Sequence, residues 1–419
     1  MNFRKQQWKM LIITMLCYLF FYTGRHNFGW AVKGMSTALG LSYTTIGWIS
    51  FSMLIGYALG QLINGNLADR FSARIMIPLG AFLSILANIG ISYSSSSTMI
   101  MILWALNGYF QSMAWAPGSK VISSWWSKDE QGKAFGFYTM AAGLSSVVTF
   151  LISIVLVQLH VEWRMLFRLP MIPLIFFALL LLWKIRDKPS NLGYADLHKT
   201  EDFEIENKQD WLTRYKNVFR NKDFMLAAIS FGFESMARYG LIFWVPVHYL
   251  GKDWKANPDY LWVTILLPIG MAAGAISFGT LSDSIFKGNR IASIRLGMFI
   301  SAVVTLAIYL SPASNIYFGS ILMFLAGFFV YGPQANFWPL SQQMLGHNQT
   351  GTGIGFMNMC GYLFAAFGEP FFGFVIDVSG QSNSIFIVIS FICLCSAGII
   401  SLINIRLRKS KKEILVKGS

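Results

Sequence analysis

The sequence predicts an all-α polytopic membrane protein with twelve transmembrane helices in two pseudo-symmetric six-helix halves. Scarce charge, repeated long apolar stretches and an internal repeat predict this class. Of the 419 residues, 55% are hydrophobic and only 12% are charged, whereas soluble domains carry about 25% charged residues. So few ionisable groups cannot cover the surfaces of two or three soluble domains, and disordered, collagen-like or coiled-coil chains need more polar or more periodic sequence.

Twelve apolar stretches are long enough to cross a hydrocarbon layer of roughly 30 Å as helices. They are not barrel strands, because such strands alternate apolar and polar residues and a run such as LFRLPMIPLIFFALLLLW does not. The predicted spans are 10–31, 44–64, 74–94, 98–118, 133–158, 164–184, 224–249, 259–281, 294–311, 316–338, 351–376 and 383–405.

The positions of Lys and Arg predict the orientation of these spans, because cytoplasmic loops are enriched in both. The N-terminal flank, the even-to-odd loops, the central polar stretch and the tail carry most of them. The loops on the opposite side carry only Lys33, Arg164, Arg168, Lys252 and Lys255. We therefore expect a multi-pass protein of the cell (inner or plasma) membrane with both termini in the cytoplasm. The net charge of +14 is then a topology signal, and nucleic acid is not an expected partner.

A polar stretch at 185–222 separates the spans into two groups of six. Its mixed charges and its Pro, Gly and Asn content are typical of a linker. We predict an N-terminal half at 1–184, a cytoplasmic linker at 185–222, and a C-terminal half with a basic tail at 223–419. The four cysteines lie in apolar spans, which favours buried thiols over disulfides or a metal site.

The two halves resemble each other at matched positions, which indicates a duplicated unit. Many secondary transporters are such repeats, with the substrate site at the repeat interface near the bilayer midplane. Three pairs lie 213 to 219 positions apart: Asp69 and Asp283 in GNLADR and GTLSDS, Arg25 and Arg238 on the first helix of each half, and Gly108 and Gly327 on the fourth.

Arg25 and Arg238 are the strongest candidates for a substrate site. An Arg at the bilayer centre costs at least about 2.5–3.5 kcal/mol, so it faces a cavity or a partner. Each lies roughly fifteen residues from its cytoplasmic flank, which at about 1.5 Å per residue is halfway across the membrane. The guanidinium fork matches phosphate or carboxylate, so we expect both to converge on one oxyanion. The alternative is structural pairing, in which Glu234 neutralises Arg238 from one helical turn away.

Further polar residues lie near these arginines. Tyr18 and Tyr22 lie on the helix face of Arg25, where their hydroxyls either donate to an anion or belong to ordinary core packing. Glu369, in the eleventh span, is either a proton-coupling group or a counter-ion for an arginine, and Glu234 has the same two interpretations.

Three residues at the cytoplasmic ends of helices are candidates for gating. Asp69 and Asp283 follow glycines in tight loops, where a carboxylate caps a helix N-terminus or pairs with a basic residue. Lys120 lies near the cytoplasmic end of the fourth span and is a gate or topology partner, with Asp69 as a candidate partner. We interpret all three as conformational groups and not as substrate ligands.

The sequence contains no GxSxG, HExxH, P-loop or Cys/His metal spacing. We therefore expect no enzymatic activity, no cofactor and no ATP-driven pumping. Transport would then use a solute or ion gradient.

Motifs distributed over nearly the whole chain carry a family resemblance. GNLADRFSAR resembles the loop motif of the major facilitator superfamily. More specifically, the chain resembles the organophosphate:phosphate antiporters, the family of glycerol-3-phosphate and hexose-phosphate carriers. The matching segments are FFYTGRHNF, LNGYFQSMAWAPGSKVISSWWSKDEQG, RDKPSNLG, ARYGLIFWVP, LSDSIFKGNR, GFFVYGPQANF and GTGIGFMNMCGYLFAAFG.

This resemblance implies a monomeric carrier with the major facilitator fold in the lipid bilayer. Such a carrier exchanges an organic phosphate for inorganic phosphate by a rocker-switch movement. The two central arginines of the family bind the phosphoryl group and match Arg25 and Arg238. Tyr18 and Tyr22 match its aromatic positions near the site.

Two departures from the family widen the choice of substrate. Ala142 stands where glycerol-phosphate carriers place a histidine on the fifth helix, and Gln61 stands where they often carry a lysine. Together with Glu234 and Glu369, they keep open a proton-coupled carrier of another organic anion, such as a sulfonate or carboxylate. A second alternative is a non-transporting sugar-phosphate sensor of the same fold. A carrier of neutral sugars or drugs is disfavoured, because two membrane arginines would lack an anion.

Overall fold

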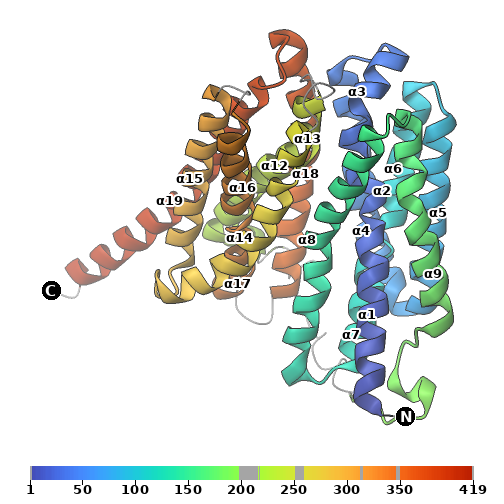
Figure 1. The fold of residues 1–419 in the computed structure, drawn as a ribbon. Coiled ribbons are helices and arrows are strands. Elements are labelled where there is room, and N and C mark those ends of the chain that lie inside the picture. Colours follow the sequence, from blue (N-terminus) through green and yellow to red (C-terminus); the bar gives the residue numbers. More distant parts are fainter. Residues whose placement is uncertain are drawn as a thin grey trace. The chain divides into compact units, whose positions relative to one another are not determined.

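The computed structural model describes residues 2–197, 216, 218–250, 259–311, 315–345 and 350–417, and these are almost entirely helical (Figure 1). None of the described residues forms a β-strand, as the predicted all-α class requires. The first helices are α1 (Phe3–Phe21), α2 (Thr23–His26), α3 (Phe28–Leu39), α4 (Tyr43–Arg70), α5 (Ala73–Tyr93), α6 (Ser97–Gln111), α7 (Trp115–Trp125), α8 (Lys128–Gln158) and α9 (Ile172–Lys184). Three 3-10 helices accompany them: η1 (Trp163–Phe167), η2 (Leu169–Met171) and η3 (Pro189–Leu192). The later helices are α12 (Lys222–Leu250), α13 (Asp259–Val263), α14 (Leu266–Ser284), α15 (Arg290–Leu310), α16 (Ile316–Tyr331), α17 (Gln334–Leu345), α18 (Thr350–Ser379) and α19 (Ser384–Lys417).

Nine helical segments within the described ranges are long and apolar enough to cross a membrane. They coincide with nine of the twelve predicted spans. These segments are Tyr43–Gly65, Ala73–Tyr93, Ala134–Gln158, Trp163–Lys184, Tyr260–Ser284, Arg290–Leu310, Ile316–Leu345, Gly353–Ser379 and Ser384–Ile403.

The remaining predicted spans, the first, fourth and seventh, are also helical but are broken or more polar. The first is divided into α1, α2 and α3, and the fourth into α6 and α7. The seventh is α12, which runs unbroken for 29 residues but contains Glu234 and Arg238. Irregular backbone and charged side chains are tolerated at membrane depth where protein buries them or where they line a cavity. These three spans, and the break between α16 and α17 in the tenth span, are therefore places to search for a functional site.

The chain forms two compact units. Unit 1 contains Met1–Ile205, Val245–Ile265 and Glu369–Asp377, and unit 2 contains Glu206–Trp244, Leu266–Gly368 and Val378–Ser419. Helices α12 and α18 thus contribute to both units. The predicted division at a linker of 185–222 stays a prediction.

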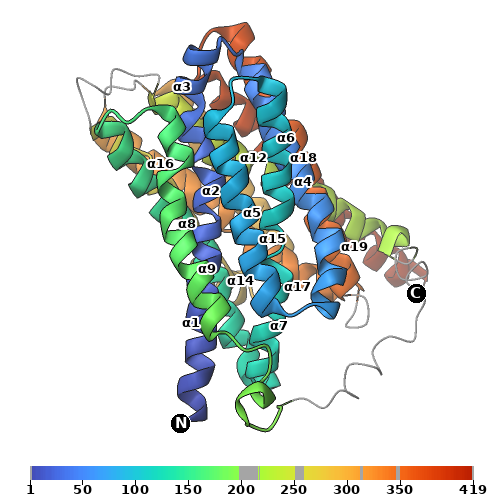
Figure 2. The ribbon, with the colours of Figure 1, turned by 90° about the vertical axis from the view of Figure 1, so that its right-hand side faces the viewer.

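Helices α4, α5 and α6 pack side by side in unit 1 (Figures 1 and 2). The contact between α4 and α6 depends on Gly108, because a Cβ added there would collide with the carbonyl oxygen of Met53. In unit 2, a Cβ on Gly327 of α16 would collide with the carbonyl oxygen of Leu267 on α14. Small residues let membrane helices approach backbone to backbone. The glycines that repeat between the halves therefore make the same kind of close contact in each unit.

Asp377, near the end of α18, caps the N-terminus of α4 within unit 1. Its carboxylate accepts hydrogen bonds from the backbone N–H groups of Tyr43 at 3.0 Å and Thr44 at 2.7 Å, and from the Thr44 hydroxyl at 2.6 Å. The first N–H groups of a helix have no intrahelical acceptor, and a negative charge there is favourable. No motif in the sequence predicts this contact.

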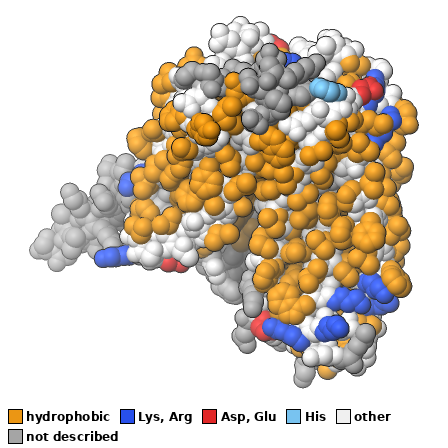
Figure 3. Space-filling model, in the orientation of Figure 1, with side chains coloured by type: hydrophobic (Ala, Val, Ile, Leu, Met, Phe, Trp, Pro, Cys, Tyr) orange, Lys and Arg blue, Asp and Glu red, His pale blue; other side chains and the backbone are white. Residues whose placement is uncertain are grey.

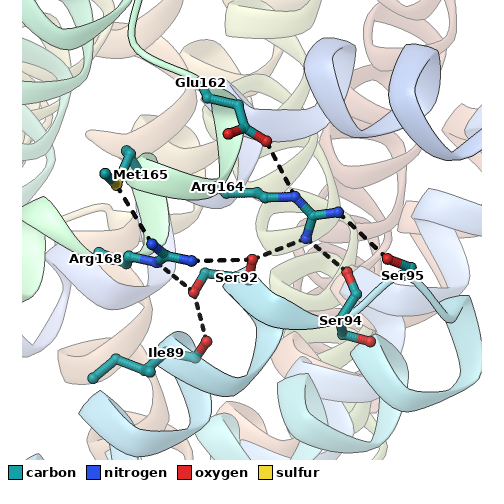
Figure 4. A network of polar contacts seen from close by, with 8 residues as sticks. All are labelled: Ile89, Ser92, Ser94, Ser95, Glu162, Arg164, Met165 and Arg168. Atoms are coloured by element: carbon teal, nitrogen blue, oxygen red, sulfur yellow. Dashed lines mark hydrogen bonds and ion pairs between the residues drawn. The ribbon is translucent and has the colours of Figure 1, made fainter.

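Arg164 and Arg168 hold the C-terminal end of α5 (Figure 4). Arg164 Nη1 donates to the carbonyl oxygens of Ser92 and Ser94, both at 2.9 Å, and Arg168 Nε donates to the Ser92 hydroxyl at 2.7 Å. Arg164 Nε also lies 3.1 Å from the carboxylate of Glu162. Cations stabilise the carbonyl-rich end of a helix. These two exceptions to the charge asymmetry therefore have a local structural role.

Apolar side chains cover much of the visible surface (Figure 3). Ile75, Leu86 and Phe176 are each about 60% exposed. Such a broad apolar surface is typical of helices that face hydrocarbon and not water.

Candidate functional site

Arg25 lies in α2, a four-residue helix between two breaks in the first predicted span. Asparagine side chains link this region to other helices. Asn107 Nδ2 of α6 donates to the carbonyl oxygen of Gly24 in α2 at 2.9 Å, and Asn27 Nδ2, at the second break, donates to the carbonyl oxygen of Leu166 in η1 at 2.9 Å. These contacts stabilise the irregular backbone inside the protein. The Arg25 side chain that it carries is buried.

The guanidinium of Arg25 contacts a neutral amide and two aromatic rings. Its Nε donates to Gln111 Oε1 at 3.2 Å. Its Cζ lies 4.9 Å from the ring centroid of Tyr22 and 4.1 Å from that of Tyr57. Both distances are within the range of cation–π attraction.

Gln111, the last residue of α6, is itself fixed by hydrogen bonds. Its Nε2 donates to the carbonyl oxygen of Phe21 at 3.0 Å and lies 3.4 Å from the Ser84 hydroxyl. Ser84 in turn donates to Asn107 Oδ1 at 2.6 Å. Because the amide nitrogen is engaged on this side, the carbonyl oxygen of Gln111 points to Arg25.

Arg238 has closely similar surroundings in unit 2. It lies in the middle of α12, and its Nη1 donates to Gln334 Oε1 at 3.1 Å. Its Cζ lies 4.6 Å from the ring centroid of Tyr239 and 5.3 Å from that of Tyr331. Tyr331 ends α16 and Gln334 begins α17, so Arg238 lies beside the point where this span is interrupted.

Each unit therefore places one arginine against a glutamine carbonyl and two tyrosine rings. In unit 1 the arginine lies next to the break between α6 and α7, and in unit 2 next to the break between α16 and α17. The two arginines and Tyr22 are predicted from the sequence. Five other residues are not predicted from the sequence: Tyr57, Gln111, Tyr239, Tyr331 and Gln334. The two glutamines do not occupy matched positions of the repeat, so comparison of the halves could not reveal them. The sequence pattern that could have indicated them is a glutamine shortly after the Gly-Tyr-Phe motif at 108–110 and after the Gly-Phe-Phe motif at 327–329.

Tyr18 and Tyr22 lie together, and their hydroxyl oxygens are 3.0 Å apart. Tyr22 stacks on Arg25, whereas the Tyr18 ring packs 4.8 Å from that of Tyr138. Tyr18 therefore reaches Arg25 through Tyr22. A binding role for either hydroxyl stays a prediction.

The two membrane carboxylates lie in different units. Glu234 is fully buried in unit 2, and its Oε2 accepts a hydrogen bond from the Ser235 hydroxyl at 3.2 Å. Although Glu234 precedes Arg238 by one turn, the two described side chains form no ion pair. Glu369 is also buried, at the start of the α18 segment that belongs to unit 1. Coupling roles for both stay predictions.

The predicted gating residues make contacts at helix ends. Lys120 Nζ donates to the carbonyl oxygen of Ala68 in the last turns of α4, at 2.7 Å. Asp283 lies 3.5 Å from Arg290 Nη2, a basic partner of the kind expected. The Asp69 side chain lies outside the described residues. None of these contacts tests gating.

Ala142 and Gln61 stand where the family carries basic residues, but unit 1 still contains an imidazole near Arg25. Ala142 lies one turn before Ser146 on α8, and the Ser146 hydroxyl lies 3.0 Å from Nδ1 of the buried His26. His26 belongs to α2, next to Arg25, so this ring comes from the first span and not from the fifth. Gln61 is partly buried on α4.

Within the part of the chain that the structure describes, no group of three or more His, Cys, Asp or Glu side chains is arranged to hold a metal ion. The cysteines are free thiols. Cys17 and Cys393 are buried, and Cys360 and Cys395 are partly buried.

The sequence profile of the Major Facilitator Superfamily matches residues 14–369, and the chain therefore belongs to this superfamily. A bacterial homologue of the human lysosomal transporter Spinster, in a crystal structure of its inward-facing and unoccupied conformation, has a similar fold. Its TM-score is 0.78 at 15% identity, over 95% of each chain. The predicted fold class is thus confirmed, and the chain is a multi-pass membrane protein.

Curated relatives confirm the resemblance to the organophosphate:phosphate antiporters. The glycerol-3-phosphate transporter of Bacillus subtilis is 25% identical, over 93% of this chain and 90% of the relative. A probable hexose phosphate transport protein of Chlamydia pneumoniae is 26% identical, over 87% and 84%. The membrane sensor protein UhpC of Escherichia coli is also 26% identical, over 87% and 85%.

Proposed function

We propose that this protein is a secondary transporter that exchanges a small organic phosphate for inorganic phosphate by alternating access. The observation that carries the proposal is a buried Arg25 and a partly buried Arg238, each oriented by a glutamine carbonyl and two tyrosine rings. The names of the curated relatives support a phosphorylated substrate.

A neutral acceptor orients a guanidinium without cancelling its charge. A carboxylate would satisfy the same N–H groups but would neutralise the arginine and compete with an anionic substrate. Arg238 forms no ion pair with any described residue, and its buried Nε donates to none of them. This side chain therefore retains donor capacity for a phosphoryl oxygen.

The substrate class follows from the number of cations. Two arginines supply two positive charges, which matches a phosphoryl dianion. With Ala142 and Gln61 in place of two further basic groups, a substrate that carries its charge on one phosphoryl group, such as a sugar phosphate, fits better than a more highly charged one.

We propose a location in the cell membrane, with both termini in the cytoplasm and the chain acting as a monomer in the bilayer. The distribution of Lys and Arg over the loops supports this orientation. Reaction of single cysteines placed in opposite loops with an impermeant thiol reagent tests it.

The test of the transport proposal is exchange in proteoliposomes that contain the purified full-length chain and internal inorganic phosphate. We expect external glycerol-3-phosphate or a hexose phosphate to release labelled phosphate, and matched sulfonates and carboxylates to release little. Equal release by sulfonates or carboxylates would contradict the phosphate assignment. Absence of exchange with every compound, despite measurable binding, would contradict transport.

A second candidate function is sensing without transport, which the similarity to a membrane sensor protein favours. In this case organic phosphates would bind to the purified protein but would not exchange across the bilayer. The proteoliposome experiment therefore separates the two functions.

A further inference from the structure

Glu234 is a buried carboxylate that the proposed exchange does not use. It is 0% exposed, its Oε2 accepts one hydrogen bond from Ser235, and its Oε1 accepts none from the described residues. A charged carboxylate removed from water is costly unless it is paired and well hydrogen-bonded. Ionisable groups that persist inside a membrane span in such surroundings are candidates for function.

One cation lies within electrostatic reach of Glu234 among the described residues of unit 2. Arg238 follows it by one turn on the same face of α12. The other titratable neighbours are Tyr331 at the end of α16 and Cys393 on α19. Tyr362 of α18 interacts with Arg238. The charge on Glu234 is therefore balanced by Arg238 and by no second cation of this neighbourhood.

An anion on Arg238 would change this balance. While the site is empty, the charges of Glu234 and Arg238 compensate each other, although the side chains do not form an ion pair. When a phosphoryl group binds to Arg238, the same cation has to balance two anionic groups in a medium of low dielectric constant. Like charges that share a site favour protonation of one of them. The carboxylate of Glu234 is the group positioned to accept that proton.

We propose that Glu234 binds one proton when the anion binds to Arg238 and releases it when the anion leaves. This inference rests on the proposed function, because it requires Arg238 to bind the anion. The proton comes from the solution to which the site is open and forms an O–H bond on the carboxylate. No other bond changes. During exchange against phosphate, one proton crosses the membrane with each anion. When no anion is present inside, a pH gradient drives net uptake of the external anion.

Calorimetric titration of the purified chain with inorganic phosphate measures this proton directly. Binding is measured in two buffers with different enthalpies of ionisation, so the difference in heat gives the protons taken up. Because phosphate itself titrates near neutral pH, wild type is compared with Glu234→Gln, which keeps the size of the side chain and removes its ionisation. We expect the variant to take up about one proton fewer per phosphate bound.

Glu369→Gln provides the matched control, because Glu369 is the second buried membrane carboxylate. We expect this variant to take up as many protons as wild type. Equal proton uptake in wild type and Glu234→Gln would overturn the inference, as would a loss of the proton in Glu369→Gln instead. If phosphate does not bind to the wild type at all, the proposed function fails instead.

Transport of inorganic phosphate into liposomes without internal anion gives the second readout. With one coupled proton, each inward pH gradient of one unit raises the accumulation of phosphate about tenfold. We expect Glu234→Gln to lose this pH-driven accumulation and to retain exchange against internal phosphate. An unchanged response to the gradient would contradict the inference.

A measurement on the wild-type protein covers the case in which Glu234→Gln does not fold. Infrared difference spectra with isotope-labelled glutamate report the C=O band of a protonated carboxyl group. We expect this band to appear when phosphate is added and to shift with the label. A spectrum without a labelled carboxyl band would overturn the inference.

Discussion

Arg25 and Arg238 each donate a hydrogen bond to a glutamine. For binding of an anion, the important property of this acceptor is that it carries no charge. A glutamate in the same position would form a stronger hydrogen bond with the guanidinium. It would also neutralise the charge that an anionic substrate needs. The glutamines therefore orient the arginines at little electrostatic cost to binding.

Replacing these acceptors by carboxylates tests their role. We expect Gln111→Glu and Gln334→Glu each to weaken binding of inorganic phosphate by about tenfold or more, because a fixed negative charge competes for the guanidinium. Titration calorimetry of the purified variants measures the dissociation constants. Gln381→Glu adds the same charge on an exposed loop residue and should bind like the wild type. Unchanged binding of phosphate in both Gln111→Glu and Gln334→Glu would show that the arginines do not contact the anion.

The Tyr57 ring is the closer of the two aromatic groups on Arg25, at 4.1 Å. A cation–π contact contributes about 0.5–2 kcal/mol, depending on how well it is desolvated. We therefore expect Tyr57→Leu to weaken phosphate binding by about twofold to thirtyfold, and Tyr57→Phe to retain most of the affinity. Equal losses in both variants would instead assign the effect to the hydroxyl.

The sequence allowed the prediction of residues that are unusual in a membrane span, but not of their partners. Arg25, Arg238 and Glu234 stand out because charge is rare in apolar helices. Tyr57 and Gln111 do not stand out, since aromatic and amide residues are common in this chain. They approach Arg25 through packing of α4 and α6 against α2, and such tertiary contacts have no local signature.

At the scale of helices, the interruptions of the first and fourth spans position the site. The break at Tyr22 and Asn27 presents Arg25 from a four-residue helix, and the end of α6 at Gln111 presents its acceptor. The lengths of the apolar stretches predicted where the spans lie. They did not predict the breaks, because the side-chain amides that bind the backbone carbonyl groups at the breaks come from distant parts of the sequence.

The Asp377 cap on α4 gives a prediction at the same scale. Loss of a side-chain cap costs about 0.5–2 kcal/mol. We therefore expect Asp377→Ala to lower the apparent Tm of the detergent-purified protein by a few degrees, and Asp377→Asn to lower it less, because the amide oxygen still accepts. Thermal unfolding monitored by light scattering or fluorescence measures both. Asp377→Asn also controls for the loss of charge, because it removes the charge and keeps an acceptor oxygen. An equal Tm for Asp377→Ala and wild type would refute the cap.

At the scale of the whole molecule, two units with similar local sites support the view of the chain as a duplicated carrier. Gly108 and Gly327 make the same backbone contacts in their units, and Arg25 and Arg238 have the same kinds of neighbours. Superfamily membership and the all-α class agree with the sequence prediction. The identity of the substrate does not follow from this symmetry, because it depends on groups that contact the non-phosphate part of the molecule.

We propose that Arg25 and Arg238 are each required for anion binding during exchange. The most direct measurement compares phosphate exchange in proteoliposomes that contain wild type, Arg25→Lys or Arg238→Lys at equal amounts of inserted protein. Lysine keeps the charge but cannot form the bidentate fork, and the lost charge-assisted hydrogen bonds correspond to about 30-fold or more in exchange rate. We predict that both variants insert normally and lose exchange to this extent, whereas wild-type rates in either variant would show that the substituted arginine does not bind the anion.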